Sequence, residues 1–281
     1  MSMNRDNTAS VLSPEQIHEL VTKPFLDAAT ATVIGTVVPT NAMQLRVPII
    51  TADPDSTFVA EGAEIDITAT TVGEVVATPA KVAALSVLTS ELVADSEFNA
   101  LEIVGNGLIR SLASQTDHAF FTADVGGETP PGIADVTGVN EIAAGAVVNT
   151  DAFAEAVNAA ESVGASLSAF VCNPATALKL AQLKQGDGSN LPLLGSDPTT
   201  PTRKQIQGVP LMVNRYVADN TVWGVDKRYT IIALRKDAEL ITDYSAFFTS
   251  DRVAVRAIQR VAFAFPFPES IQKITLSDPS S

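Results

Sequence analysis

The chain has 281 residues, of which 46% are hydrophobic and 18% charged. This length and content allow a substantial buried core, in one large domain or two subdomains, and exclude a disordered protein. Lys and Arg number 18 against 32 Asp and Glu, for a formal net charge of −14. Such an excess of acid disfavours tight or sequence-specific binding of nucleic acid, so any contact with phosphates is expected to be weak.

The single cysteine, Cys172, excludes an intrachain disulfide and a site built from several cysteines. It is expected to be a small buried hydrophobic residue in a protein that folds in a reducing compartment. Residues 1–10 lack the apolar core of a signal peptide, and no apolar run of about 18 residues occurs, so no membrane span is predicted.

The N-terminal part of the chain reads as an arm. It is polar at first, helical around Pro14–Val21, and then small and apolar without clear periodicity to about residue 43. We interpret this pattern as a segment that packs against something outside its own domain.

A two-stranded hairpin is predicted next. The run QLRVPII at residues 44–50 alternates like a strand and contains Pro48, which favours an edge position. Turn residues follow at Asp53–Pro54 and Glu61–Gly62, and VGEVVATPAKVAALSVLTSEL then returns as strand.

The hairpin region carries charge of almost one sign. Between Val47 and Ile109 the only basic residue is Lys81, whereas the acids are Asp53, Asp55, Glu61, Glu64, Asp66, Glu74, Glu91, Asp95, Glu97 and Glu102. Such a ribbon repels itself, and an isolated two-stranded ribbon is marginal in water. Either it gains stability from a surface outside itself, or it is a solvated acidic face folded onto its own domain.

A long helix is the next predicted element. Apolar residues at helical spacing follow Ser96, a suitable N-cap, and are Leu101, Val104, Leu108, Leu112 and Ala119. A helix of about 25 residues, or roughly 38 Å, is implied. It ends at Phe120–Phe121, in FFTADVGGETPPGI. Such a helix needs a flat sheet or neighbouring subunits to cover its apolar stripe.

Shorter alternating elements follow. Asp151–Ser162 reads as an amphipathic helix begun by Asn149 or Thr150, and SLSAFVC-NPATALKLAQLK reads as strand, Asn cap, Pro and helix. Residues 186–204 form a predicted exposed loop. Four strand-sized runs come after it: VPLMVN, TVWGV, YTIIAL and AELITDY.

The run from Asp251 to Phe267 is predicted as a strand, because β-branched and aromatic residues dominate it, although a helix is an alternative. Among its odd-numbered residues from Val253 to Phe267, only Gln259 is not apolar. Arg252, Arg256 and Arg260 recur on the opposite face and form a line of positive charge, which we name the arginine strip. The alternative is that these arginines only neutralise local acids, namely Asp251, Glu239 or Asp243.

No catalytic, cofactor-binding or metal-binding residues are predicted. His118 lies beside Asp117 and near Ser114, but adjacent helical residues point in different directions and cannot hold a catalytic relay. The sequence GNG at 105–107 lies inside the helical pattern, where small residues allow close packing, and it is no dinucleotide fingerprint. The acids between Asp53 and Glu64 match no calcium loop.

Several blocks together resemble the major capsid proteins of tailed bacteriophages (Caudoviricetes) of the Hong Kong 97 type. In the family's order they are VPII, FVAEGAEI, TPAKVAALSVLTSELVADS, the long helix and FFTAD…PPGI, within roughly 47–267. The resemblance implies an α+β fold. Its parts are an N-terminal arm (1–45), an extended loop (46–85), a peripheral domain with a spine helix (86–133), an α/β axial domain (134–240) and return strands of the peripheral domain (241–281).

By this resemblance the chain is a structural protein and no enzyme. It assembles with itself through pentamers and hexamers into an icosahedral shell around double-stranded DNA, within a virion capsid that is built in the host cytoplasm. Portal protein, a separate scaffold, a decoration protein and non-specific contact with packaged DNA are the other implied partners. The expected subunit contacts are made by the extended loop, at Asp53, Asp55, Phe58, Glu61 and Glu64, and by the arginine strip.

One departure from the family concerns covalent cross-linking, which needs a lysine near the loop tip and an asparagine on the neighbour. Here the tip reads Glu61-Gly62-Ala63-Glu64, and Asp251 stands in the likely acceptor region. Two alternatives remain open at this point. One is an encapsulin, which encloses enzymes in a shell of the same fold, and the other is an acidic α/β enzyme with its substrate under the 186–204 loop.

Overall fold

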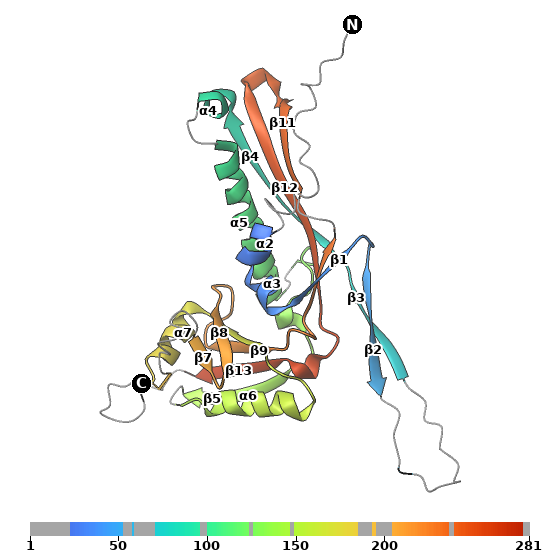
Figure 1. Ribbon diagram of the computed structural model, residues 1–281, viewed down its shortest axis with the longest axis vertical. Helices are drawn as coiled ribbons and strands as arrows, with labels where there is room; N and C mark the ends of the chain where they lie inside the picture. Colours follow the sequence, from blue (N-terminus) through green and yellow to red (C-terminus); the bar gives the residue numbers. More distant parts are fainter. Residues whose placement is uncertain are drawn as a thin grey trace.

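The computed structural model describes residues 23–52, 58, 71–95, 100–123, 126–146, 149–184, 193–194, 204–235 and 239–277. It has an α+β architecture with two sheets and a separate two-stranded ribbon (Figure 1). A long sheet with one long helix beside it forms an elongated half, and the second sheet with its helices forms a compact half. The ribbon projects away from both.

The first sheet is organised around β12 (Arg252–Ala264). On one side β12 pairs antiparallel with β4 (Ala80–Thr89), and on the other with β11 (Glu239–Phe247) and then β10 (Ile231–Arg235). β1 (Thr36–Thr40) adds to β10 in parallel. The prediction of a strand at 251–267 is confirmed, since Val253, Val255 and Ala257 are buried in alternation with exposed arginines.

The long helix is α5 (Ala100–Phe121), which has 22 residues and covers one face of this sheet (Figure 1). Residues 96–99 lie outside the described ranges, so the Ser96 cap stays a prediction. Leu108 and Leu112 are buried against Val255 and other residues of the sheet, so a flat sheet covers the apolar stripe of the helix. A Cβ added to Gly105 would lie 3.1 Å from Leu240 Cδ2, which confirms close packing at this glycine.

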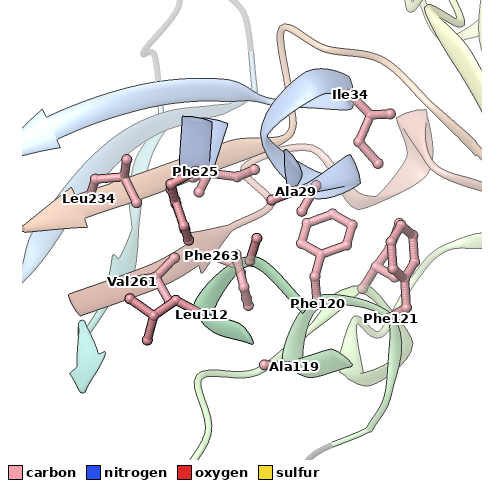
Figure 2. Packing of buried hydrophobic residues seen from close by; sticks show 14 of the residues in the cluster. Phe25, Ala29, Ile34, Leu112, Ala119, Phe120, Phe121, Leu234, Val261 and Phe263 are labelled. Atoms are coloured by element: carbon pink, nitrogen blue, oxygen red, sulfur yellow. The ribbon is translucent and has the colours of Figure 1, made fainter. Parts of the chain in front are cut away.

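The C-terminal end of α5 carries a cluster of aromatic side chains. Phe120 is fully buried, with its ring 4.9 Å from that of Phe121 and 5.0 Å from that of Phe263, both in edge-to-face contact (Figure 2). Phe25 and Ile34 close the same cluster from the N-terminal segment. The Phe120–Phe121 pair of the sequence therefore ends the helix inside the core.

Part of the predicted arm packs on its own chain, which corrects our interpretation of residues 23–40. This stretch forms α2 (Lys23–Ala28), α3 (Thr30–Ile34) and β1, and both helices pack against α5. Elements of five or six residues are too short to show a period in the sequence. In addition, α3 receives its N-terminal cap from Asp117, a residue 86 positions away from Ala31.

The second sheet has the strand order β5-β13-β9-β6-β8-β7. These strands are β5 (Asn140–Ala146), β6 (Ala169–Cys172), β7 (Lys204–Ile206), β8 (Val209–Val213), β9 (Thr221–Val225) and β13 (Gln272–Ser277). α6 (Asp151–Ser162) packs on β5 and β13. α7 (Pro174–Ala181) begins as predicted, because Asn173 Oδ1 accepts a hydrogen bond from the Thr176 backbone N–H at 2.7 Å.

Sheet membership differs from the expected division of the chain in two places. β10 precedes residue 241 but belongs to the first sheet, and β13 follows it but lies between β5 and β9 in the second. A strand's sheet depends on pairing with segments that lie from about 30 to more than 100 residues away, which local sequence patterns do not reveal. The domain limits themselves stay predictions.

Cys172 is expected to be unreactive in the folded protein. Its side chain is fully buried, and burial raises the pKa of its thiol to about 12, only slightly opposed by the charge of Lys204. Since the thiolate is the reactive form, a thiol reagent at pH 8 should label the native subunit hardly at all and the denatured chain fully. Rapid labelling without denaturant would contradict this burial.

Candidate assembly interfaces

The ribbon consists of β2 (Leu45–Ala52) and β3 (Thr71–Ala77), which pair antiparallel from Leu45 opposite Ala77 to Ala52 opposite Thr71. Only its root is seated on the body, where Val47 and Val75 contact a patch of small side chains made of Ala77, Ala233, Ala262 and Ala264. Toward the far end Ile50 and Val72 are exposed. The hairpin predicted from the sequence therefore exists, and little of it is buried within the subunit. The predicted return strand was too long, because its ribbon part ends at Ala77, Ala80–Thr89 pairs with β12, and Ser90–Asp95 is a helix.

The predicted contact residues of the loop lie almost entirely beyond the described part of the chain. Asp53, Asp55, Glu61 and Glu64 fall outside it, whereas Phe58 is described and fully exposed. Within the ribbon, Arg46 and Glu74 form an ion pair at 3.3 Å, and both are largely solvent-exposed. Such a pair contributes at most about 1 kcal/mol, so it cannot hold the ribbon in place.

Along β4, β11 and the part of β12 that pairs with β11, no described element covers the face of the first sheet opposite α5. Residues that stand directly opposite each other in antiparallel strands point to the same side, so Leu85 and Arg256 share a face, as do Val87 and Ala254. Leu85 is 61% exposed and Ile241, opposite Arg256 on the other side, is 42% exposed. This open sheet face, defined by β4, β12 and β11, is apolar along its middle and carries the arginine strip.

The arginine strip lies on this face as the sequence predicted, with Arg252 and Arg256 exposed and Arg260 half-buried. None of the three has an acidic partner within ion-pair distance in the part of the chain that the structure describes. Hydrogen bonds from Ser245 hold the pKa of Asp243 below its usual value, with a smaller contribution from the charge of Arg256. Local neutralisation is therefore weak and reaches only the middle of the strip.

The residues near the end of α5 do not form a catalytic relay. The Asp117 carboxylate is buried and accepts hydrogen bonds from the backbone N–H groups of Thr30 and Ala31, at 3.0 and 2.9 Å, and from Asn214 Nδ2 at 2.7 Å. Burial raises the pKa of Asp117 and outweighs the opposing effect of these bonds. The carboxylate thus caps α3 and does not orient the exposed His118.

Ser114 and His118 instead contact Tyr216 of the turn between β8 and β9. Ser114 Oγ lies 2.5 Å from the Tyr216 hydroxyl, and the two rings of His118 and Tyr216 meet edge to face at 5.1 Å. Arg215 Nη2 donates to both hydroxyls at 2.7 Å. No sequence pattern marks this group, because its members come from segments about 100 residues apart.

Exposed aromatic side chains at the end of β11 were also missed. Tyr244, Phe247 and Phe248 lie at the far tip of the first sheet, and Phe248 is 83% exposed. The pair of phenylalanines beside turn residues was the available signal. Large exposed apolar side chains that gather at one tip are typical of a surface that another molecule covers.

Two absences apply to the described ranges only. No cluster there of three or more His, Cys, Asp or Glu side chains could hold a metal ion. Among the same residues, none of the helices combines the length and hydropathy that crossing a bilayer requires.

The chain is similar over nearly its whole length to solved capsid structures. The capsid of an empty GTA particle, computed with C5 symmetry, has a TM-score of 0.75 and 20% identity, with 99% of this chain and 95% of that chain covered. A structure from Mycobacterium phage Adephagia has a TM-score of 0.72 and 15% identity, with 100% of both chains covered. At these identities the likeness shows the fold, an α+β fold of the Hong Kong 97 type.

The sequence comparisons add the family. No protein among the curated sequences matches the chain. The family described as "Phage capsid family" matches residues 9–276, which is nearly the entire chain. With the long helix, the projecting ribbon and the two sheets in place, the chain belongs to the phage capsid family.

Proposed function

We propose that this protein is a major capsid protein, which assembles through pentamers and hexamers into an icosahedral shell around double-stranded DNA. The observation that carries the proposal is the open sheet face beside a ribbon that its own subunit hardly supports. Each copy offers an uncovered apolar sheet and a projecting ribbon, so that copies can supply each other's missing contacts. The role is structural and requires no catalytic group.

Electron microscopy of the purified full-length chain tests this proposal directly. Closed shells with five-fold and six-fold clusters of subunits are expected. A chain that stays monomeric under all assembly conditions, and turns over a substrate, would support the acidic enzyme instead. The contents of native particles distinguish an encapsulin from a virion capsid, because an encapsulin encloses enzymes whereas a virion encloses DNA.

The subunit contact that we propose joins the ribbon and loop of one copy to the open sheet face of a neighbour. The loop carries Asp53, Asp55, Glu61 and Glu64, and the open sheet face carries the arginine strip, so the charges are complementary. The exposed side chain of Phe58, with Leu85 and Ile241 of the neighbour, adds apolar area. Exposed ion pairs are individually weak, but repetition over every interface of a shell multiplies them.

Reversing one charge of the strip should weaken assembly. For Arg256→Glu we expect a higher critical concentration for shell formation, because the acidic loop would meet a like charge. We also expect this critical concentration to depend more strongly on salt than that of the unaltered chain. Light scattering during assembly at 50 and 300 mM salt measures this effect. Lys204→Glu, an equal charge change at the exposed edge strand β7, serves as the control. Equal effects of both variants would refute specific docking on the strip.

Mature shells are expected to lack covalent cross-links through the loop. An isopeptide bond needs an amine, and the lysine nearest to the tip in the sequence is Lys81, the second residue of β4, which lies opposite Arg260 and outside the ribbon. At about 3.3 Å per residue it is tens of ångströms from Glu64. Boiled particles in detergent should therefore run as one band near 29.4 kDa. A ladder of heat-resistant oligomers would contradict this expectation.

Further partners belong to the same proposal. A portal protein, a separate scaffold and a decoration protein would join the shell, which would be assembled in the host cytoplasm and become the virion capsid. Contact with the packaged DNA would be largely non-specific, in keeping with the net charge of −14. Mass spectrometry of purified native particles identifies which of these proteins accompany the shell.

A further inference from the structure

A pocket of about 450 Å³ lies where α5 meets the turn between β8 and β9. Its polar lining consists of Arg110, Ser114 and Asp117 from α5, and Asn214, Arg215 and Tyr216 from the turn. The pocket is separate from the ribbon and from the open sheet face. In a chain of strongly negative charge, two arginines line it.

Arg215 is held by neutral groups, so its charge is not cancelled. Its Nη2 donates to Ser114 Oγ and to the Tyr216 hydroxyl, each at 2.7 Å, and its Cζ lies 4.8 Å from the centre of the Tyr216 ring. A guanidinium has five N–H donors in a rigid fork. The Nε and Nη1 hydrogens of Arg215 meet no acceptor among the described residues, and Arg110 donates to none of them either.

The two hydroxyl groups supply one more donor. Each accepts a hydrogen bond from Arg215, and they lie 2.5 Å from each other, so one hydroxyl donates to the other. The hydrogen of the second hydroxyl has no acceptor among the described residues. It therefore remains available to a bound group.

The only carboxylate that lines the pocket is already engaged. Asp117 is 5% exposed, and its two oxygens accept the hydrogen bonds from Thr30, Ala31 and Asn214. It cannot turn toward the arginines without uncapping α3. The pocket thus presents several N–H and O–H donors and no unengaged carboxylate, which is the chemistry of an oxyanion receptor.

We propose that this pocket binds a phosphate group between Arg110, Arg215 and the Ser114–Tyr216 hydroxyl pair. The donors come from two guanidinium groups and a hydroxyl on two different elements. They suit the several oxygens of a tetrahedral phosphate better than the two oxygens of a planar carboxylate. The phosphate comes either from the free ion or from the backbone of a nucleic acid. In the second case the site rests on the proposed function and anchors packaged DNA to the shell.

Titration of the full-length chain with inorganic phosphate, followed by phosphorus NMR at constant ionic strength, tests the site. We expect saturable binding that weakens at least tenfold in Arg215→Gln and in Arg110→Gln. It should weaken less in Tyr216→Phe, which removes only a supporting hydroxyl. Lys204→Gln, which removes one exposed positive charge from edge strand β7 outside the pocket, is the matched control and should bind as tightly as the unaltered chain. Folding of every variant is checked by far-UV circular dichroism.

Two further probes identify the ligand. A short DNA duplex that binds with the same dependence on Arg215 identifies the nucleic-acid backbone as the source, whereas binding of inorganic phosphate alone identifies the free ion. Three results would overturn the proposal: no saturable phosphate binding, an equal loss in Lys204→Gln, or acetate that competes as strongly as phosphate. Shell formation is measured separately by microscopy, so the site and the proposed function can fail independently.

Discussion

Removal of the loop between β2 and β3 is expected to abolish closed shells while the subunit stays folded. Ala52 pairs with Thr71, so an Asn-Gly turn in place of residues 53–70 would close the hairpin with the register intact. Among the described residues, the apolar side chains of the ribbon pack on their own subunit at the alanine patch, and both large hydrophobic cores lie elsewhere. We therefore expect an unchanged unfolding midpoint by circular dichroism and no shells by electron microscopy.

The control for the loop removal is a second loop deletion, made outside the ribbon. Shortening residues 195–203, which precede β7 in the chain, lie outside the described residues and belong to the loop predicted from the sequence, leaves the ribbon untouched. Shells should still form from this variant. If the loop removal unfolds the subunit, or if shells close without the loop, then the ribbon does not have the intermolecular role that we propose.

Among Gly→Ala substitutions at the described glycines, Gly132→Ala is expected to destabilise the subunit most. A Cβ at Gly132 would fall well inside contact distance of the Ala119 carbonyl oxygen and 2.5 Å from that of Phe120. Both atoms belong to the backbone of α5 and cannot rotate away. Overpacking of this kind costs about 3 kcal/mol, a large part of the roughly 5–15 kcal/mol that stabilises a typical domain.

Thermal and urea unfolding of the purified subunit measure this loss. The matched control is Gly126→Ala in the same connection, where an added Cβ would meet no described atom within 4 Å and φ is not left-handed. We expect the control to change the free energy of unfolding by less than about 0.5 kcal/mol. Equal stabilities of the two variants would show that the segment after α5 does not pack as the structure has it.

Much of the fold could be predicted, because long elements carry their own period. Twenty-two residues of α5 place apolar side chains on one stripe, and in the 13-residue strand β12 the odd-numbered side chains from Val253 to Phe263 are buried while Arg252 and Arg256 are exposed. Caps such as Asn173 act within four residues, so they are equally visible in the sequence. The position of the arginine strip also followed from alternation alone, since opposite faces of a strand are fixed by its geometry.

Tertiary structure alone decided which elements meet. α3 and β1 are five residues each, too short to show a period, and their place became apparent only through Asp117 and β10. The pairing of β13 with β5 and β9 joins distant segments, and so does the contact of Ser114 with Tyr216, 102 positions apart. By itself, the sequence determined what each segment is, because propensity and periodicity are local. The structure decided what each segment touches, because long-range contacts depend on the complementary surfaces of other segments.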